Sequence, residues 1–258
     1  MNIVFALAGI VITELYRRKD FYVLFVLTAL LTLLMGSVNF FNEKTVRIVK
    51  DLALLLIWIS ALVIAIGTTA RQIPAERENR TIFPLLAKPV TRAHVVVGKF
   101  AGCWFACGMA LIVFYLFFGV ITAARLQHGP TAILFEGLWL QWAMLGIVVA
   151  LVLLGSVVFT APSSNTTICF IVVVGILLVG KYLNGVALRQ AEPLRSIVYA
   201  IYFFIPHLEF YDVRDLLVND HAPVGAAYCA LATLYAAVYS ALLLFAAWLV
   251  FRRKPLQV

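Results

Sequence analysis

Charge is what this 258-residue chain has least of: 12% of its residues are Asp, Glu, Lys or Arg, while 64% are hydrophobic. A soluble globular domain carries about 25% charged residues and about 45–50% apolar ones. So little polar surface excludes an ordinary water-soluble fold. We therefore expect a single all-α membrane domain, residues 1–258, that crosses the bilayer several times.

Motifs for hydrolysis, phosphate binding and metal binding are also missing. Gly98-Lys99 is followed by Phe100 and lacks the earlier glycine of a phosphate loop. The four histidines lie in different loops, and the four cysteines form no CxxC pair. Cys103 and Cys107 share a helix face, and we interpret them as packing residues rather than thiolate ligands. We expect no catalytic residue, no metal site and no cofactor on this chain.

The long apolar runs have no charge near their centres. A proton pump or an ion-coupled transporter needs ionisable side chains inside the membrane to carry its coupling ion. Their absence argues against both classes, and against a channel built on rings of charge. If this chain moves a substrate, its energy has to come from another polypeptide.

Six apolar runs, which carry charge only near their ends, predict six transmembrane helices, because about 17–25 apolar residues are needed to cross the hydrocarbon core. Gly98 and Gly102 open the third run and would let a neighbouring helix approach closely. Thr91-Arg92 can cap the helix that leads into this run. The predicted spans are residues 21–38, 52–70, 98–122, 134–159, 166–183 and 226–251.

Residues 1–20 precede the first span. The apolar run Ile3–Ile12 is too short to cross the bilayer, and the basic cluster Arg17-Arg18-Lys19 follows it. We expect a helix that lies in the membrane interface, with a frayed N-terminus as the alternative.

The basic residues are unevenly distributed between the loops. With six spans and both termini in the cytoplasm, the cytoplasmic segments hold twelve of the twenty Lys and Arg residues but four of the twelve acids. The net charge of +8 then falls on the inner side. This is the positive-inside bias of a membrane protein, so we expect no nucleic-acid partner.

Residues 72–100 are the longest polar interruption in the first half of the chain. Residues 75–79, AEREN, suit the start of a solvated helix, Leu85-Leu86 offers an apolar knob, and Pro89 stops or kinks the chain. We expect a short amphipathic helix on the cytoplasmic surface that fits a groove in a partner protein. The alternative is a loop that binds anionic lipid.

The segment before the last span contains an apolar stretch that cannot cross the membrane. Ser196–Ile205 is ten residues long and is broken by Pro206. Irregular backbone at membrane depth is tolerated where protein covers it or where it lines a cavity. We expect short re-entrant helices here, with an ordinary extracellular amphipathic loop as the alternative.

The stretch from Glu76 to Phe100 resembles the segment between the second and third spans of ABC-2 type transporter permeases. That segment carries a Glu, a basic residue, a Leu pair, a Pro-(Val/Ile)-(Ser/Thr)-Arg motif and Gly-Lys at the next helix. Phe83-Pro84 departs from this pattern and would shorten the helix. The residues that match are Glu76, Arg80, Thr81, Leu85, Leu86, Pro89, Val90, Arg92, Gly98 and Lys99.

A second segment, YFFIPHLEFYDVR at residues 202–214, is similar to one found before the last span in a subgroup of these permeases. The subgroup includes the permease of the nitrous-oxide reductase maturation transporter and the gliding-motility permeases.

The resemblance implies a permease subunit with a type V ABC exporter-like fold in the bacterial cytoplasmic (inner) membrane. It would work as a homo- or heterodimer, driven by a separate cytoplasmic ABC ATPase that holds ATP and Mg. Residues 1–20 would be its elbow helix. The coupling helix that docks on the ATPase would comprise Glu76, Arg77, Arg80, Thr81, Leu85, Leu86, Pro89 and Arg92. A second cytoplasmic contact would comprise Ala161, Pro162, Ser163 and Ser164, and the extracellular gate would comprise Phe204, Pro206, Glu209 and Phe210.

A second class of function stays open on sequence alone: a membrane-embedded assembly factor or enzyme that binds a cytoplasmic partner without transporting. A co-purifying ABC ATPase favours the permease. Catalytic side chains poised within the membrane favour the alternative.

Overall fold

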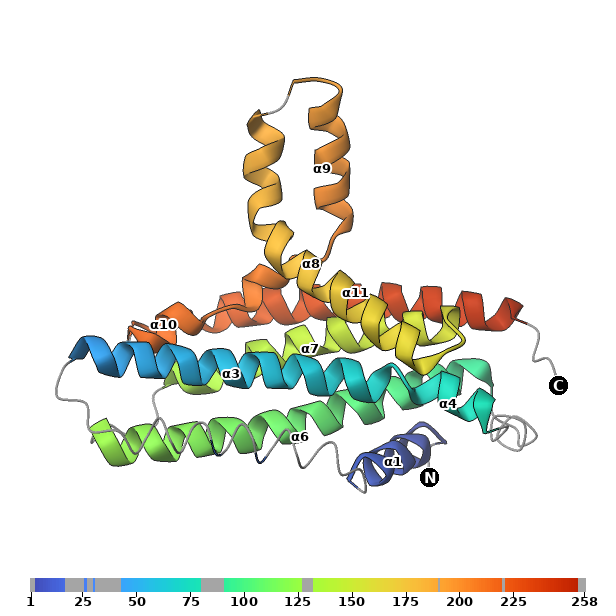
Figure 1. Ribbon diagram of the computed structural model, residues 1–258, viewed down its shortest axis with the longest axis horizontal. Helices are drawn as coiled ribbons and strands as arrows, with labels where there is room; N and C mark the ends of the chain where they lie inside the picture. Colours follow the sequence, from blue (N-terminus) through green and yellow to red (C-terminus); the bar gives the residue numbers. More distant parts are fainter. Residues whose placement is uncertain are drawn as a thin grey trace.

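The computed structural model describes residues 3–16, 26, 30, 43–79, 91–126, 132–189, 191–219 and 221–254, and their regular structure is helical (Figure 1). Within these residues, five helices are long and apolar enough to cross a membrane. They are α3 Glu43–Thr69, α6 Arg92–Leu126, α7 Ala132–Val158, α8 Pro162–Arg189 and α11 Ala226–Arg253.

These five helices lie where the sequence predicts spans two to six. The predicted first span, residues 21–38, lies outside the described residues apart from positions 26 and 30. Helices α3, α6, α7 and α11 each run along the long axis of the molecule for most of their length (Figure 1). At one end of this bundle α3, α7 and α11 finish while α6 and α8 begin, and α4 (Gln72–Glu78) lies there. We call this end the α4 end and the other the opposite end.

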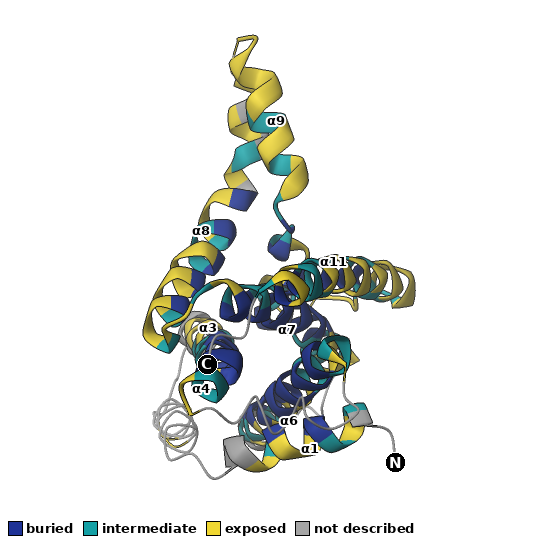
Figure 2. Cartoon of the chain, turned by 90° about the vertical axis from the view of Figure 1, so that its right-hand side faces the viewer, coloured by how far each residue is buried: buried dark blue, intermediate teal, exposed yellow. Residues whose placement is uncertain are grey.

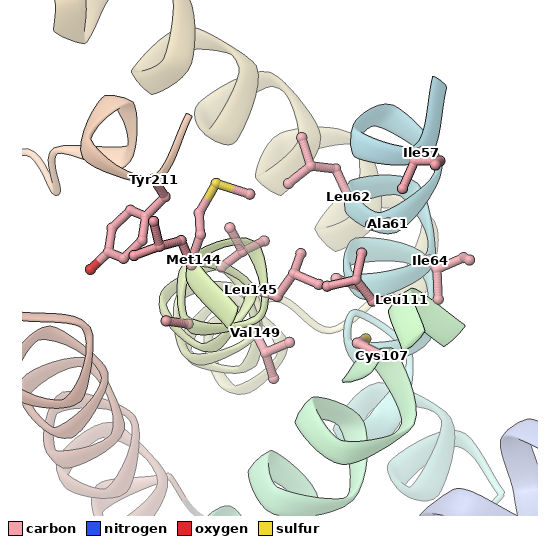
Figure 3. Close-up of a cluster of buried hydrophobic side chains, with 14 of the residues drawn as sticks. Ile57, Ala61, Leu62, Ile64, Cys107, Leu111, Met144, Leu145, Val149 and Tyr211 are labelled. Carbon is pink, nitrogen blue, oxygen red and sulfur yellow. The ribbon is translucent and has the colours of Figure 1, made fainter. Parts of the chain in front are cut away.

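Helix α7 lies at the centre of the bundle, and most of its own residues are buried, dark blue in Figure 2. Figure 3 shows Met144, Leu145 and Val149 of α7 beside apolar side chains of α3 and α6, among them Leu62 and Leu111. In a membrane the hydrophobic effect contributes little to helix association, because lipid tails are as apolar as the side chains. Close packing of small and branched side chains therefore holds such a core together.

Helix α1, Ile3–Tyr16, packs against the first half of α6. A Cβ atom added at Gly98 would lie 2.8 Å from the Cβ of Leu7, and one added at Gly102 would lie 2.7 Å from the Cβ of Val11. Both glycines therefore permit a close helix approach, which confirms the prediction for this pair. The matching four-residue steps mean that the two helices run in the same direction. That residues 1–20 lie in the membrane interface stays a prediction.

Helix α8 extends beyond its predicted span and is followed by α9, Leu194–Phe204, which returns beside it. The pair projects away from the bundle (Figures 1 and 2), and α9 has no buried residue. As the sequence indicated, α9 ends just before Pro206. The chain then forms a short 3₁₀ helix η1, Leu208–Tyr211, and the helix α10, Arg214–Val218, before α11.

Candidate functional site

Helix α4 follows α3 after a turn at Ala70-Arg71. Its Ile73 is fully buried in a separate apolar cluster to which three long helices contribute. A buried Ile cut back to Ala typically costs about 2–5 kcal/mol, so this one side chain holds α4 firmly on the bundle. The other buried members of the cluster are Val95, Val96, Leu153, Val157, Ala247 and Phe251.

The limits of α4 correct one expectation. Residues 75–79 do not begin a helix; the helix begins at Gln72 and its C-cap is Asn79. The physical reason is that buried Ile73 fixes the first turn on the bundle, where Pro74 is tolerated because the first N–H groups of a helix need no partner within it.

A buried lysine joins α4 to α6. The Nζ of Lys99 lies 2.7 Å from Oε1 of Glu76 and 3.1 Å from Oε1 of Gln72, both on α4. The Lys99 side chain is 4% exposed and that of Glu76 is 25% exposed. A buried cation needs a charged or strongly polar partner, so this pair fixes the register of α4 against the second turn of α6.

A buried asparagine joins α8 to the junction of α3 and α4. The Nδ2 of Asn165 donates to the carbonyl of Ala70 at 2.9 Å, and its Oδ1 accepts from the Sγ of Cys169 at 3.1 Å. Gly155 of α7 makes room for this amide, since a Cβ there would clash with Asn165 and Cys169. Asn165 directly follows the predicted second cytoplasmic contact, so it links that turn to the base of α4.

Basic side chains gather around Phe251 at the end of α11. The guanidinium carbons of Arg92 and Arg77 lie 5.3 Å and 5.9 Å from the centroid of its ring. Arg92 also donates from Nη1 to the carbonyls of Phe251, of Arg252 at 3.0 Å and of Lys254 at 3.1 Å. These bonds satisfy the last carbonyl groups of α11, where a cation is favoured.

Lys254 likewise binds the last carbonyl groups of α7, whose end lies beside that of α11. Its Nζ donates to the carbonyls of Val157 at 2.9 Å and Val158 at 2.7 Å. Burial lowers the pKa of Lys254, and the nearby charge of Arg77 lowers this pKa further. Cations thus bind the ends of α7 and α11 to the first turn of α6.

Between the middle of the bundle and its opposite end, tyrosines tie the segment 203–211 to the first half of α11. The hydroxyl of Tyr228 donates to the carbonyl of Phe210 at 2.6 Å, and that of Tyr239 donates to the carbonyl of Phe203 at 3.2 Å. The hydroxyl of Tyr211 donates back to the carbonyl of Ala232 at 2.8 Å, and burial raises the Tyr211 pKa. The irregular backbone after α9 is therefore held by side-chain hydrogen bonds.

His207 lies in the middle of this segment. Its ring is stacked on Phe210 with centroids 5.4 Å apart and meets Tyr202 edge-on at 4.3 Å. The backbone N–H of His207 donates to the hydroxyl of Tyr235 at 3.0 Å. The result is an aromatic cluster around one imidazole.

A model of the family described as ABC-2 family transporter protein matches residues 3–255. The chain belongs to this family. It is thus a multi-pass membrane protein and the transmembrane subunit of an ABC transporter, a class of transporter powered by an ABC ATPase. No curated protein sequence matches the chain.

With the ABC-2 family shown, the coupling-helix residues expected from the resemblance can be located in part. Glu76 binds Lys99, while Arg77 and Arg92 lie against Phe251 rather than on an open surface. Thr91 caps α6 as predicted, because its Oγ1 accepts from the N–H of His94 at 3.3 Å. The remaining expected docking residues, Arg80, Thr81, Leu85, Leu86 and Pro89, lie outside the described residues.

The residues expected at the second contact lie at the bend between α7 and α8. Ala161, Ser163 and Ser164 are exposed there, and Pro162 is the first residue of α8. Sequence reasoning did not single out Asn165 beyond placing it in this turn. The available signal was a polar amide beside an otherwise apolar helix.

The four residues expected at the gate share the segment 203–211 but have different surroundings. Pro206 is buried, and Phe210 packs on His207. Phe204 is 81% exposed. Glu209 approaches α8 so closely that a Cβ at Gly180 would lie 2.9 Å from its Oε2. Sequence reasoning missed His207 and the tyrosines of α11. The number of tyrosines in the predicted span 226–251 could have indicated the latter. Among the described residues, no group of three or more His, Cys, Asp and Glu could hold a metal ion.

Proposed function

We propose that this chain is the permease of an exporter, that it works as a pair of permease subunits, and that a separate cytoplasmic ABC ATPase docks at its α4 end. In this proposal the α4 end and both termini face the cytoplasm, as the distribution of basic residues indicates. The similarity of residues 202–214 supports the subgroup of nitrous-oxide reductase maturation and gliding-motility permeases.

The observation that carries the proposal is the attachment of α4. This short helix is bound to α6 through Lys99, to α8 through the Asn165–Ala70 hydrogen bond, and to α7 and α11 through Ile73. A surface loop that merely bound lipid would not need such links. A force applied to α4 acts on several transmembrane helices at once, which is what a coupling helix has to do.

Docking itself is assigned to residues 76–92 and to the turn Ala161–Ser164. The exposed Glu78 and Asn79 end α4, and the predicted Leu85-Leu86 knob follows them in the sequence. Arg77 and Arg92 contribute indirectly, because they hold α4 and α6 against Phe251. Asn165 gives the two docking surfaces a common support at Ala70, so both move as one body.

The segment 203–211 is proposed as the extracellular gate, with Phe204, Pro206, Glu209 and Phe210 among its residues. Side-chain hydrogen bonds from α11 hold this segment, and such bonds exchange partners at a lower cost than packed helices do. Movement of α11 against α8 would therefore shift the segment without unfolding the bundle.

The test is co-purification with an ABC ATPase of the same organism, followed by measurement of ATP hydrolysis in vesicles. Leu85→Glu is expected to abolish both association and stimulated hydrolysis, because it places a charge in an apolar contact. Arg47→Glu, at an exposed position of α3 near the opposite end, is the matched control and should leave both intact. Association and stimulation that survive Leu85→Glu would refute docking at this segment.

A further inference from the structure

An apolar groove runs between α6 and α11 on a side of the bundle away from α4. Near the α4 end it is a hollow of about 460 Å³ whose lining includes Val97, Phe245 and Trp248. A second hollow of about 320 Å³ continues from it toward Trp139 and Thr233. The two share Ala241 and Leu244, so they form one groove.

The groove is long enough to hold an acyl chain of one leaflet. From Thr233 to Trp248, α11 advances roughly 22 Å at 1.5 Å per residue. One leaflet contributes about half of the roughly 30 Å of membrane hydrocarbon. Small side chains give the groove its depth, and these are Ala93, Ala143, Gly146, Ala237 and Ala241.

Four of the five tryptophans of the chain line this groove: Trp104, Trp139, Trp142 and Trp248. Trp104 and Trp142 are stacked with centroids 4.6 Å apart, and each indole N–H donates to the backbone carbonyl of the other residue, at 2.9 Å and 3.1 Å. With their N–H groups satisfied, these rings present only apolar surface.

The end of the groove at Trp248 is basic. The guanidinium carbon of Arg252 lies 5.7 Å from the centroid of the Trp248 ring, Arg253 is exposed beside it, and Arg92 directly precedes Ala93 of the lining. In the part of the chain that the structure describes, the ion pairs with carboxylates are Lys99–Glu76 and Arg214–Asp212. These arginines thus place positive charge at the mouth of an apolar groove, and no acid among the described residues is paired with it.

We propose that the groove between α6 and α11 binds one anionic phospholipid, with an acyl chain against the tryptophans and the phosphate at Arg252 and Arg253. Charge complementarity selects this occupant. A transmembrane helix of a second permease copy would fill the groove but bring no anion to the arginines. A zwitterionic lipid would bring a phosphate whose charge its own ammonium offsets. The phosphate site at Arg252 and Arg253 lies outside the residues to which docking is assigned.

Brominated lipids test the site directly, because bromine on an acyl chain quenches a tryptophan that it touches. The full chain, carrying Trp58→Phe to remove the tryptophan outside the groove, is reconstituted into phosphatidylcholine vesicles. Brominated phosphatidylglycerol or brominated phosphatidylcholine is then added in increasing amounts. Phosphatidylglycerol is expected to reach half-maximal quenching at a mole fraction lower by on the order of tenfold, since each arginine near the surface favours an anionic lipid severalfold.

Separate variants test the phosphate site and the acyl-chain groove. The double variant Arg252→Gln/Arg253→Gln should lose the preference for phosphatidylglycerol, whereas Arg189→Gln, on the exposed hairpin, should keep it. Ala241→Phe fills the groove and should remove the saturable quenching while leaving the intrinsic fluorescence spectrum in unbrominated lipid unchanged. If Ala241→Phe does not fold into a monodisperse protein, Ala237→Leu replaces it.

Equal quenching by the two lipids would overturn the proposal. A preference for phosphatidylglycerol that survives Arg252→Gln/Arg253→Gln would also overturn it. So would saturable quenching that survives in Ala241→Phe, because the lipid would then be held at the protein surface alone. High salt should weaken the preference, since it screens the arginines.

Discussion

Replacing Glu76 with Ala is the sharpest perturbation of the α4 attachment. The change leaves the ammonium of Lys99, which is 4% exposed, with the neutral amide oxygen of Gln72 at 3.1 Å as its remaining side-chain contact on α4. Removing one partner of a buried ion pair costs about 3–5 kcal/mol, because the other charge stays buried. Glu76 is itself a quarter exposed, so we expect the lower part of this range.

A loss of about 3 kcal/mol corresponds to a fall in melting temperature of roughly 6–12 °C for a chain of this size. The assay is thermal unfolding of the purified protein in one fixed detergent and lipid mixture. Glu76→Gln keeps an oxygen acceptor for Lys99 and removes only the charge, so its melting temperature should fall between those of the wild type and Glu76→Ala.

A double-mutant cycle isolates the pair from the rest of the site. In a Lys99→Met background there is no buried ammonium to strand, so Glu76→Ala should cost much less, with a coupling energy of about 1–3 kcal/mol between the two positions. Equal falls in melting temperature with Lys99 and with Met at this position would refute the ion pair as the link between α4 and α6.

Three further predictions concern other links. Asn165→Ala should lower the melting temperature by several degrees, because it breaks the bond to Ala70 and leaves a cavity beside Gly155; Ser163→Ala, on the exposed side of the same turn, should not. Glu136→Ala should loosen the first turn of α11, since Glu136 accepts from the N–H of Val224 at 2.8 Å, and faster hydrogen exchange there would reveal it. Gly102→Leu should release α1 from α6 and expose residues 3–16 to added protease, whereas unchanged protection would contradict the close approach.

The sequence was sufficient for features that depend on chain composition and on single residues. Apolar runs located the five long helices, Pro206 marked the end of α9, and Thr91 marked the start of α6. Gly98 and Gly102 predicted the close approach of a neighbouring helix, which is α1. Each of these follows from local chemistry that does not depend on where the rest of the chain lies.

The links that make α4 part of the bundle could not be predicted from the sequence. Lys99 looked like a charge at the edge of a span, because its partner depends on how α4 folds back onto α6. Asn165 bonds to a residue 95 positions earlier. The misplaced start of α4 has the same origin, since Ile73 is anchored by helices distant in sequence and not by any local signal.

Helix α3 offers the shortest route from α4 to the proposed gate. At one end, the carbonyl of Ala70 binds Asn165 and the chain continues directly into α4. Near the middle of α3, the guanidinium carbon of Arg214 lies 5.2 Å from the centroid of the Trp58 ring. Arg214 also pairs with Asp212 at 2.7 Å, a bond that raises the Arg214 pKa, and Asp212 directly follows Tyr211 of the segment 203–211. Because a helix resists compression along its axis, we expect a displacement imposed on α4 to pass along α3 to Trp58, and from there through Arg214 and Asp212 to this segment.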